Sequence, residues 1–138
     1  MMRFVLALIW MAQSVAADSS VLSAINAERS ERGLVALTWD AELEQAAARH
    51  ALDLHRTGRF SHDGSDGSNV LDRVSRTGFR ACFAAENIAK GQRSLPEVMN
   101  SWMQSKGHRR NILSRRAKSV AVVLGKDNLW VMVLAAPC

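Results

Sequence analysis

Five polar side chains of this sequence are of types that do chemistry: His50, His55, His62, Glu86 and His108. Two histidines and a carboxylate are a common zinc ligand set that leaves one coordination position open. However, His62, Glu86 and His108 lie 24 and 22 residues apart, and no local signature such as H-E-x-x-H joins them. Spacing alone therefore does not establish a metal site, and each residue taken singly is more typical of a surface or hydrogen-bonding role.

Nucleophilic catalysis is not singled out by the sequence either. A serine together with His62 and Glu86 would make a triad, but Ser61 is only one of several serines nearby. No G-x-S-x-G elbow selects any of them. The chain also lacks a phosphate-binding loop, a dinucleotide fingerprint and an EF-hand loop. Its motifs therefore leave open whether the protein is an enzyme.

The segments that must position these residues are four predicted helices and a final hairpin. We expect the helices over residues 18–33, 40–58, 68–79 and 94–107, where apolar residues recur at helical spacing between capping residues and glycines. Residues 85–91 are expected to be extended, and residues 119–124 and 129–136 to form the hairpin. Because both hairpin strands are apolar on both faces, we predict an α+β fold in which helices flank a small central antiparallel sheet.

The same patterns predict individual side-chain environments. His50 lies on the apolar stripe of the second helix and is interpreted as a packed, hydrogen-bonded core histidine, whereas His55 lies off the stripe and is expected to be exposed. Leu71 is expected to face inward from the third helix, and Gly107 to end the fourth. The expected N-caps are Ser19 or Ser20, Asp40, Ser68 and Ser94, the last in a capping box with Glu97.

Residues 1–17 have the features of a cleaved signal peptide, with one early charge, an apolar run and small residues before the cleavage point. An uncleaved anchor or a buried N-terminal helix is the alternative. Residues 18–138 suit one domain and contain no run long enough to span a bilayer. We therefore expect a secreted or periplasmic protein without a transmembrane segment in the mature chain. Export favours a Cys82–Cys138 disulfide over two free buried thiols.

Basic residues are concentrated late in the chain, which carries a net charge of +5. Residues 106–118 form a basic run without an acid. Such a run most often marks a solvated face, and the alternative is a contact with lipid head groups or anionic cell-envelope polymers. Nucleic acid is not expected, because the protein is exported and the run lacks interleaved aromatic residues. The arginines expected to make such a contact are Arg109, Arg110, Arg115 and Arg116.

Three motifs follow one another in the chain: F-S-H at residues 60–62, E-N-I at 86–88 and W-M-x-S-x-G-H-R-x-N-I-L at 102–113. In this order they resemble a bacterial member of the CAP superfamily, the SCP-like domain of cysteine-rich secretory proteins, antigen 5 and pathogenesis-related 1 proteins. The resemblance covers about residues 21–136. It implies an α-β-α sandwich with a central cavity lined by two histidines and usually two acids, where some members bind a divalent metal.

Carried over motif by motif, the resemblance makes His62 and His108 the two cavity histidines and Glu86 the first acid. The position of the second acid is occupied by Ser105. The tetrad is therefore incomplete, which weakens the case for a metal such as zinc on His62 and His108. The residues expected to line and support the cavity are Asn87, Ser105 and Asn111, with the two asparagines fixing the loops by hydrogen bonds.

Membership of a family defines a fold and a site rather than a reaction. Three classes of function therefore stay open. The first is a secreted module that binds a divalent metal, a lipid or a cell-envelope component. The second is a metal- or histidine-assisted hydrolase of peptide or envelope polymer, with Glu86 as the base. The third is a structural or interaction protein in which the polar cluster only stabilises the core.

Overall fold

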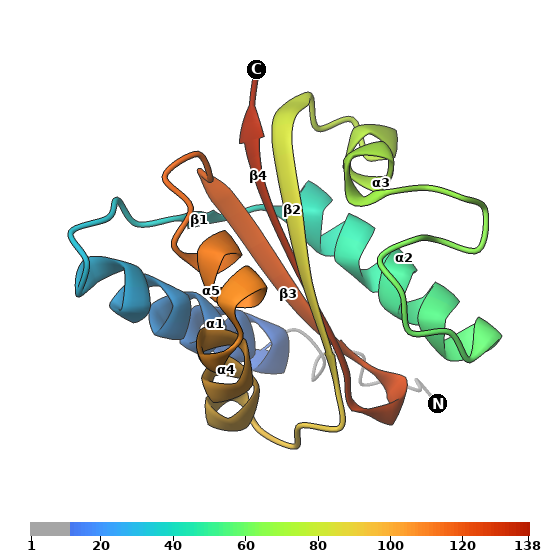
Figure 1. Ribbon diagram of the computed structural model, residues 1–138, viewed down its shortest axis with the longest axis horizontal. Coiled ribbons are helices and arrows are strands. Elements are labelled where there is room, and N and C mark those ends of the chain that lie inside the picture. The colour runs from blue at the N-terminus through green and yellow to red at the C-terminus, as the bar shows by residue number, and fades with distance from the viewer. Residues whose placement is uncertain (1–11) are drawn as a thin grey trace, which may run out of the picture.

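In the computed structural model of the chain, the backbone is described from residue 12 and the side chains from residue 19 (Figure 1). Residues 1–11 of the expected signal peptide lie outside the described residues, and cleavage after residue 17 stays a prediction. The elements are α1 (Ala12–Ser30), β1 (Thr38–Trp39), α2 (Ala41–Thr57), α3 (Val70–Arg76), β2 (Ala81–Lys90), α4 (Leu95–Gln104), α5 (Lys106–Ile112), β3 (Ser119–Gly125), the 3-10 turn η1 (Lys126–Asn128) and β4 (Leu129–Pro137).

The four strands form one sheet in the order β1-β3-β4-β2. The predicted hairpin of β3 and β4 is present, and β2 pairs antiparallel with β4 along its whole length. β1 is an addition that makes the sheet mixed, because Thr38 and Trp39 pair parallel with β3. The chain between α1 and α2 thus runs beside the outer edge of β3, whereas β2 forms the opposite edge of the sheet.

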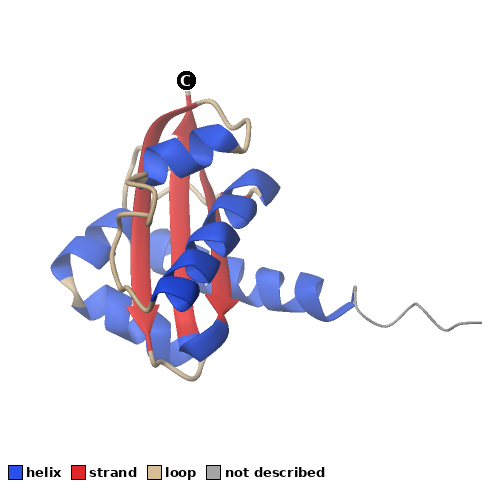
Figure 2. Cartoon of the chain, turned by 90° about the vertical axis from the view of Figure 1, so that its right-hand side faces the viewer, coloured by secondary structure: helices blue, strands red, loops and turns tan. Residues whose placement is uncertain are grey.

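Helices cover both faces of this sheet, as the apolar strands predict. α2 and α3 pack on one face, and α1, α4 and α5 pack on the other (Figures 1 and 2). Alternate residues of β4 divide between the two layers: Trp130 and Met132 join the core under α1, α4 and α5, whereas Val131 and Val133 join the core under α2. The predicted α+β sandwich is therefore confirmed.

Helix α2 forms as its local signals predict. The Asp40 carboxylate accepts hydrogen bonds from the backbone N–H groups of Glu42 and Leu43, at 2.8 and 3.0 Å. Gly58 ends the helix in the left-handed region, with φ at +68°, where glycine carries no Cβ penalty. The buried side chains are those of the predicted stripe: Leu43, Ala46, Ala47, His50, Ala51 and Leu54.

Two helix starts differ from the sequence prediction. α1 begins at Ala12, so neither Ser19 nor Ser20 caps it, because the alanine-rich segment before them continues the helix. α3 is capped by Asn69 rather than Ser68, in a reciprocal capping box with Asp72. Leu71 does not face inward as predicted but is 40% exposed, because the buried face of α3 is that of Arg73 and Val74.

The fourth helix is also shorter than predicted. α4 ends at Gln104, and α5 begins two residues later, so Gly107 lies inside α5 and does not end a helix. The break falls at Ser105, whose extended backbone separates the two helices. At the start of α4, Ser94 accepts from the N–H of Glu97, but the Glu97 carboxylate bonds to the N–H of Arg93. The capping box predicted there is therefore only half formed.

A disulfide joins Cys82 at the start of β2 to Cys138 at the end of the chain. It confirms the predicted pairing and fastens the C-terminus to the edge of the sheet. Over the described residues, no helix is long and apolar enough to cross a membrane.

Candidate functional site

The centre of the candidate site is the Glu86 carboxylate, which is 2% exposed although it lies in the edge strand β2. Its Oε2 accepts a hydrogen bond from Nη2 of Arg73 at 2.8 Å. Its Oε1 lies 2.9 Å from Nδ1 of His62 and 3.6 Å from Nε2 of His50. A buried carboxylate is stable only when it is paired and hydrogen-bonded, and these three side chains supply both.

Arg73 connects this carboxylate to the loop that carries His62. Its Nη2 also donates to the carbonyl of His62 at 2.9 Å, and its Nη1 donates to the carbonyl of Ser68 at 2.8 Å. The arginine is buried, in α3. Sequence reasoning missed this residue. The sequence did contain a signal for Arg73 in its spacing. Arg73 falls on the same helical face as Val70 and Val74, and a charge on such an apolar face needs a partner.

His50 is buried in α2, as predicted. Its Nε2 lies 2.9 Å from the carbonyl oxygen of Ser61, which requires Nε2 to carry the proton and donate it. Burial lowers the pKa of His50, so the neutral ring is favoured. Its Nδ1 is buried and has no hydrogen-bond partner among the described residues. His50 therefore supports the loop from below and borders the Glu86 carboxylate.

His62 is the member of this cluster that meets solvent, with 59% of its side chain exposed. The hydrogen bond to Glu86 raises the pKa of His62, against a smaller lowering by burial. Since Nδ1 faces the carboxylate, Nε2 is the ring nitrogen left for a ligand or a proton transfer. The loop thus presents a histidine whose orientation and protonation are set by Glu86.

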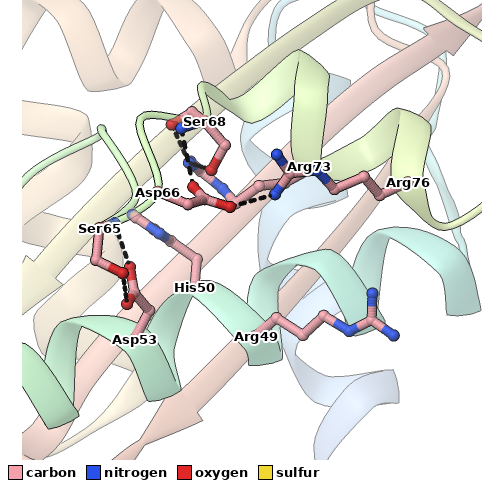
Figure 3. Close-up of a pocket in the computed structure, with 8 residues that line it drawn as sticks. All are labelled: Arg49, His50, Asp53, Ser65, Asp66, Ser68, Arg73 and Arg76. Atoms are coloured by element: carbon pink, nitrogen blue, oxygen red, sulfur yellow. Dashed lines mark hydrogen bonds and ion pairs between the residues drawn. The ribbon is translucent and has the colours of Figure 1, made fainter.

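The loop is also fixed on its outer side, at a polar pocket of about 260 Å³ between α2, the loop and α3 (Figure 3). Asp53 of α2 accepts from the N–H and the hydroxyl of Ser65, at 2.8 and 2.6 Å, and these bonds lower its pKa. Asp66 accepts from the N–H of Ser68 and from Arg76. Bonds from Ser68, and then from Arg76, hold the pKa of Asp66 well below its usual range.

The second histidine reaches the site from the other layer. Asn87 follows Glu86 in β2 and points to the opposite face, where its Nδ2 donates to the carbonyl of His108 at 3.0 Å. Asn111 in turn donates to Oδ1 of Asn87 at 2.8 Å and to the carbonyl of Glu86 at 3.3 Å. Burial, followed by the charge of His62, lowers the pKa of His108. His108 therefore lies near enough to His62 for the charge of His62 to act on it.

A cavity of about 300 Å³ opens beside His108, between the end of β2 and α4. Trp102 and Ile88 give it buried apolar walls, and Phe60, 54% exposed, stands at its rim. The side-chain Oε1 of Gln92 is buried and has no donor among the described residues. The full lining is Phe60, Ile88, Ala89, Lys90, Gln92, Ser101, Trp102, Ser105 and His108.

The donors of the described residues do not fit a resident zinc centre. Within the described part of the chain, no three His, Cys, Asp or Glu side chains are placed to hold a metal ion together. Both oxygens of Glu86 are engaged, and Ser105 stands where the resemblance places a second acid. His62 and His108 alone are one ligand short of a catalytic zinc site.

His55 and the arginines of the basic run were predicted to lie at the surface. His55 is half-buried rather than fully exposed, with its Nδ1 2.6 Å from Asp127 of the hairpin turn. Arg116 lies over the ring of Phe83, 4.5 Å from its centroid. The four arginines of the basic run, Arg109, Arg110, Arg115 and Arg116, are exposed.

Comparison with known proteins agrees with this geometry. A family model described as the cysteine-rich secretory protein family, CAP, matches residues 22–134. The chain therefore belongs to the CAP family. It is 35% identical over 114 residues to the uncharacterized protein YkwD of Bacillus subtilis, covering 82% of this chain and 44% of that protein. The chain thus spans less than half the length of this relative.

Solved structures share the same fold. An extracellular protein containing an SCP domain from Bacillus anthracis superposes with a TM-score of 0.81 at 26% identity, over 87% of this chain and 40% of that one. An outer surface protein from Borrelia burgdorferi gives a TM-score of 0.77 at 20% identity, over 94% of this chain and 97% of that one. The likeness to the Borrelia protein shows the fold alone.

Proposed function

We propose that this protein is an exported binding module whose ligand enters the cavity beside His108 and meets His62 at its rim. The observation that carries the proposal is the lining of that cavity. It combines buried apolar walls, an exposed Phe60 and a buried Gln92 oxygen without a donor among the described residues. A ligand would cover the first two and supply a hydrogen bond to the third.

The charges around the cavity favour an anionic ligand with an apolar body, such as a lipid or another cell-envelope component. Lys90 lines the cavity, and the raised pKa of His62, which lies in the same loop as the lining residue Phe60, favours the cationic form of this histidine. Arg109 and Arg110 follow His108 in α5 and are exposed, so they would raise the local concentration of anions. Export through the segment 1–17 would bring the module to the cell envelope, secreted or in the periplasm.

Calorimetry with dodecanoate as the probe tests this proposal. We expect Phe60→Ala and His62→Ala to weaken dodecanoate binding about tenfold, because Phe60 lines the cavity and His62 is the proposed cationic contact of the carboxylate. His55→Ala is the matched control, since His55 does not line this cavity and its removal should leave the affinity unchanged. If dodecanoate does not bind, or if the control weakens it equally, the proposal is wrong and the structural role of the cluster is favoured.

Zinc chloride, titrated in a thermal-shift assay, separates a metal-bridged ligand from direct binding. Two histidine ligands would leave the remaining coordination positions to water or to the ligand. A zinc-dependent rise in Tm that disappears in His62→Ala and His108→Ala would assign the metal to that pair. A rise that persists in both variants would place the zinc elsewhere.

A hydrolase is the second candidate, favoured by the contact between His62 and Glu86. A histidine with Nδ1 on a carboxylate and Nε2 exposed is the arrangement of a general base and the group that orients it. Since Arg73 and His62 already engage Glu86, we infer that His62, rather than Glu86, would take the proton. Turnover of peptide or peptidoglycan should then be lost in His62→Ala and Glu86→Gln with the fold intact. Equal turnover in these variants would eliminate the candidate.

A further inference from the structure

A third, smaller cavity of about 110 Å³ lies at the end of α1, beside the segment that leads into β3. Its lining comes from the end of α1, the turn at residues 33–35 and the segment that leads into β3. It shares no lining residue with the cavity beside His108. Three of its lining side chains are cations: Arg29, Arg115 and Lys118.

Arg29 is the unusual member of this group, because it is 1% exposed and its neighbours are carbonyl groups rather than an acid. Its Nε donates to the carbonyl of Val35 at 2.9 Å. Its Nη1 donates to the carbonyls of Ile112 and Ser114, at 3.0 and 2.7 Å. Among the described residues, no acceptor is bonded to Nη2. One nitrogen of a buried guanidinium is therefore left for a group that enters the cavity.

No anion of the described chain offsets the charge at this cavity. Within the described residues, none of the three cations forms an ion pair. Burial without a carboxylate lowers the pKa of Arg29. The polar pocket of Figure 3 is different, because Asp53 and Asp66 accompany its arginines. The lining of the polar pocket has three arginines and two aspartates, whereas the lining of the smaller cavity has three cations and no acid.

We propose that this cavity binds a phosphate group through Nη2 of Arg29 and the side chains of Arg115 and Lys118. The geometry favours a tetrahedral oxyanion over a carboxylate. A carboxylate binds arginine best through two nitrogens of one edge, and carbonyl groups already occupy Nε and Nη1. A single free nitrogen plus two cations from another segment suits a group with several oxygens pointing in different directions.

Titration of the full chain with inorganic phosphate tests the proposal, with chloride at equal ionic strength as the reference. Phosphate should raise Tm of the wild-type protein more than chloride does. In the double variant R115Q/K118Q, whose changes are both at exposed positions, the apparent affinity should fall at least about tenfold. The matched control is R109Q/R110Q, which removes the same charge from neighbouring exposed positions and should retain most of the affinity.

Two results would overturn the proposal. One is a wild-type Tm that responds equally to phosphate and chloride. The other is an equal loss of affinity in both double variants, which would indicate diffuse attraction of anions to the basic run. Arg29→Lys adds a test of the buried nitrogen, since it keeps the charge but removes Nη2 and should also weaken phosphate binding about tenfold. Unchanged phosphate affinity in a folded Arg29→Lys protein would count against the site.

The source of the phosphate group is decided by a second arm, with vesicles of phosphatidylglycerol and, as reference, phosphatidylcholine. Two results are needed to assign the group to a lipid: R115Q/K118Q lowers binding to the phosphatidylglycerol vesicles, and inorganic phosphate competes with the vesicles for the wild-type protein. If both results are found, the bound phosphate group belongs to an anionic lipid head group. If the variant affects only inorganic phosphate, the ligand is the free ion. Dodecanoate binding at the other cavity is measured in R115Q/K118Q and should not change, because neither residue lines that cavity, so the two proposals can fail separately.

Discussion

The contact between Arg73 and Glu86 should decide whether the loop that carries His62 is held in place. The test is Arg73→Met, which keeps the length of the side chain but removes the guanidinium. The variant loses the 2.8 Å bond to Glu86 and the bonds to the carbonyls of His62 and Ser68. Both members of the ion pair are buried, with side chains 8% and 2% exposed, so water cannot replace the lost partner without opening the site.

The expected cost follows from that burial. Removing one partner of a buried ion pair costs about 3–5 kcal/mol, because the other charge is left uncompensated. Glu86→Gln should cost less, about 1.5–3 kcal/mol, because the amide oxygen still accepts from Arg73. In the double variant R73M/E86Q neither buried charge remains. Its cost should therefore be smaller than the sum of the two single costs, by at least about 1 kcal/mol.

The wild-type protein, the two single variants and the double variant form a double-mutant cycle. Urea unfolding at pH 7 measures the free energy of unfolding of all four proteins. With a slope of about 2 kcal/mol per molar urea, Arg73→Met should lower the midpoint by about 2 M. The exposed pair of Arg76 and Asp66 provides the control, since Arg76→Met should cost less than about 1 kcal/mol. Additive single costs, within about 0.5 kcal/mol, would mean that the two charges do not stabilise each other and would refute the reasoning.

Two further outcomes follow from single contacts. The bond to Glu86 raises the pKa of His62, so NMR should find its midpoint above the ordinary 6.5 and at or below 6.5 in Glu86→Gln. The raised pKa means that the contact between His62 and Glu86 stabilises the fold fully below pH 6.5 and loses its effect as pH rises through the raised pKa. A titration midpoint of His62 that is unchanged in Glu86→Gln would contradict this. Reduction of Cys82–Cys138, 56 residues apart, should lower the free energy of unfolding by about 4 kcal/mol in urea melts, and an unchanged urea midpoint would contradict it.

The parts of the fold that could be predicted are those fixed by neighbouring residues. Helix α2 begins at Asp40 and ends at Gly58 because both signals act within one turn of the helix. The hairpin of β3 and β4 is equally local, since a short turn joins two apolar runs. The two strands also predicted helices on both faces of the sheet. Their side chains are apolar on both faces, so each face has to be covered by helices.

The parts that escaped prediction depend on contacts between distant segments. β1 has only two residues, and it pairs with a strand about 80 positions later. The spacing of Arg73 indicates only that its charge needs a partner, and Glu86 is identified as that partner only when α3 is packed against β2. The division of α4 from α5 at Ser105 has no glycine or proline to mark it. The resemblance placed His62 beside Glu86, in agreement with the 2.9 Å contact between them, because a family resemblance carries information about distant contacts.

The cluster around Glu86 fixes how His62 can be used, whatever its ligand. The loop is tied to Arg73 and, through the carbonyl of Ser61, to His50, so His62 does not have to be ordered when a ligand arrives. A side chain ordered in advance loses less entropy on binding, which favours a recognition role. The contact with Glu86 also turns Nδ1 of His62 inward, so Nε2 is the ring nitrogen that faces outward. In the proposed binding role, a ligand would therefore reach His62 from the side on which Nε2 is exposed.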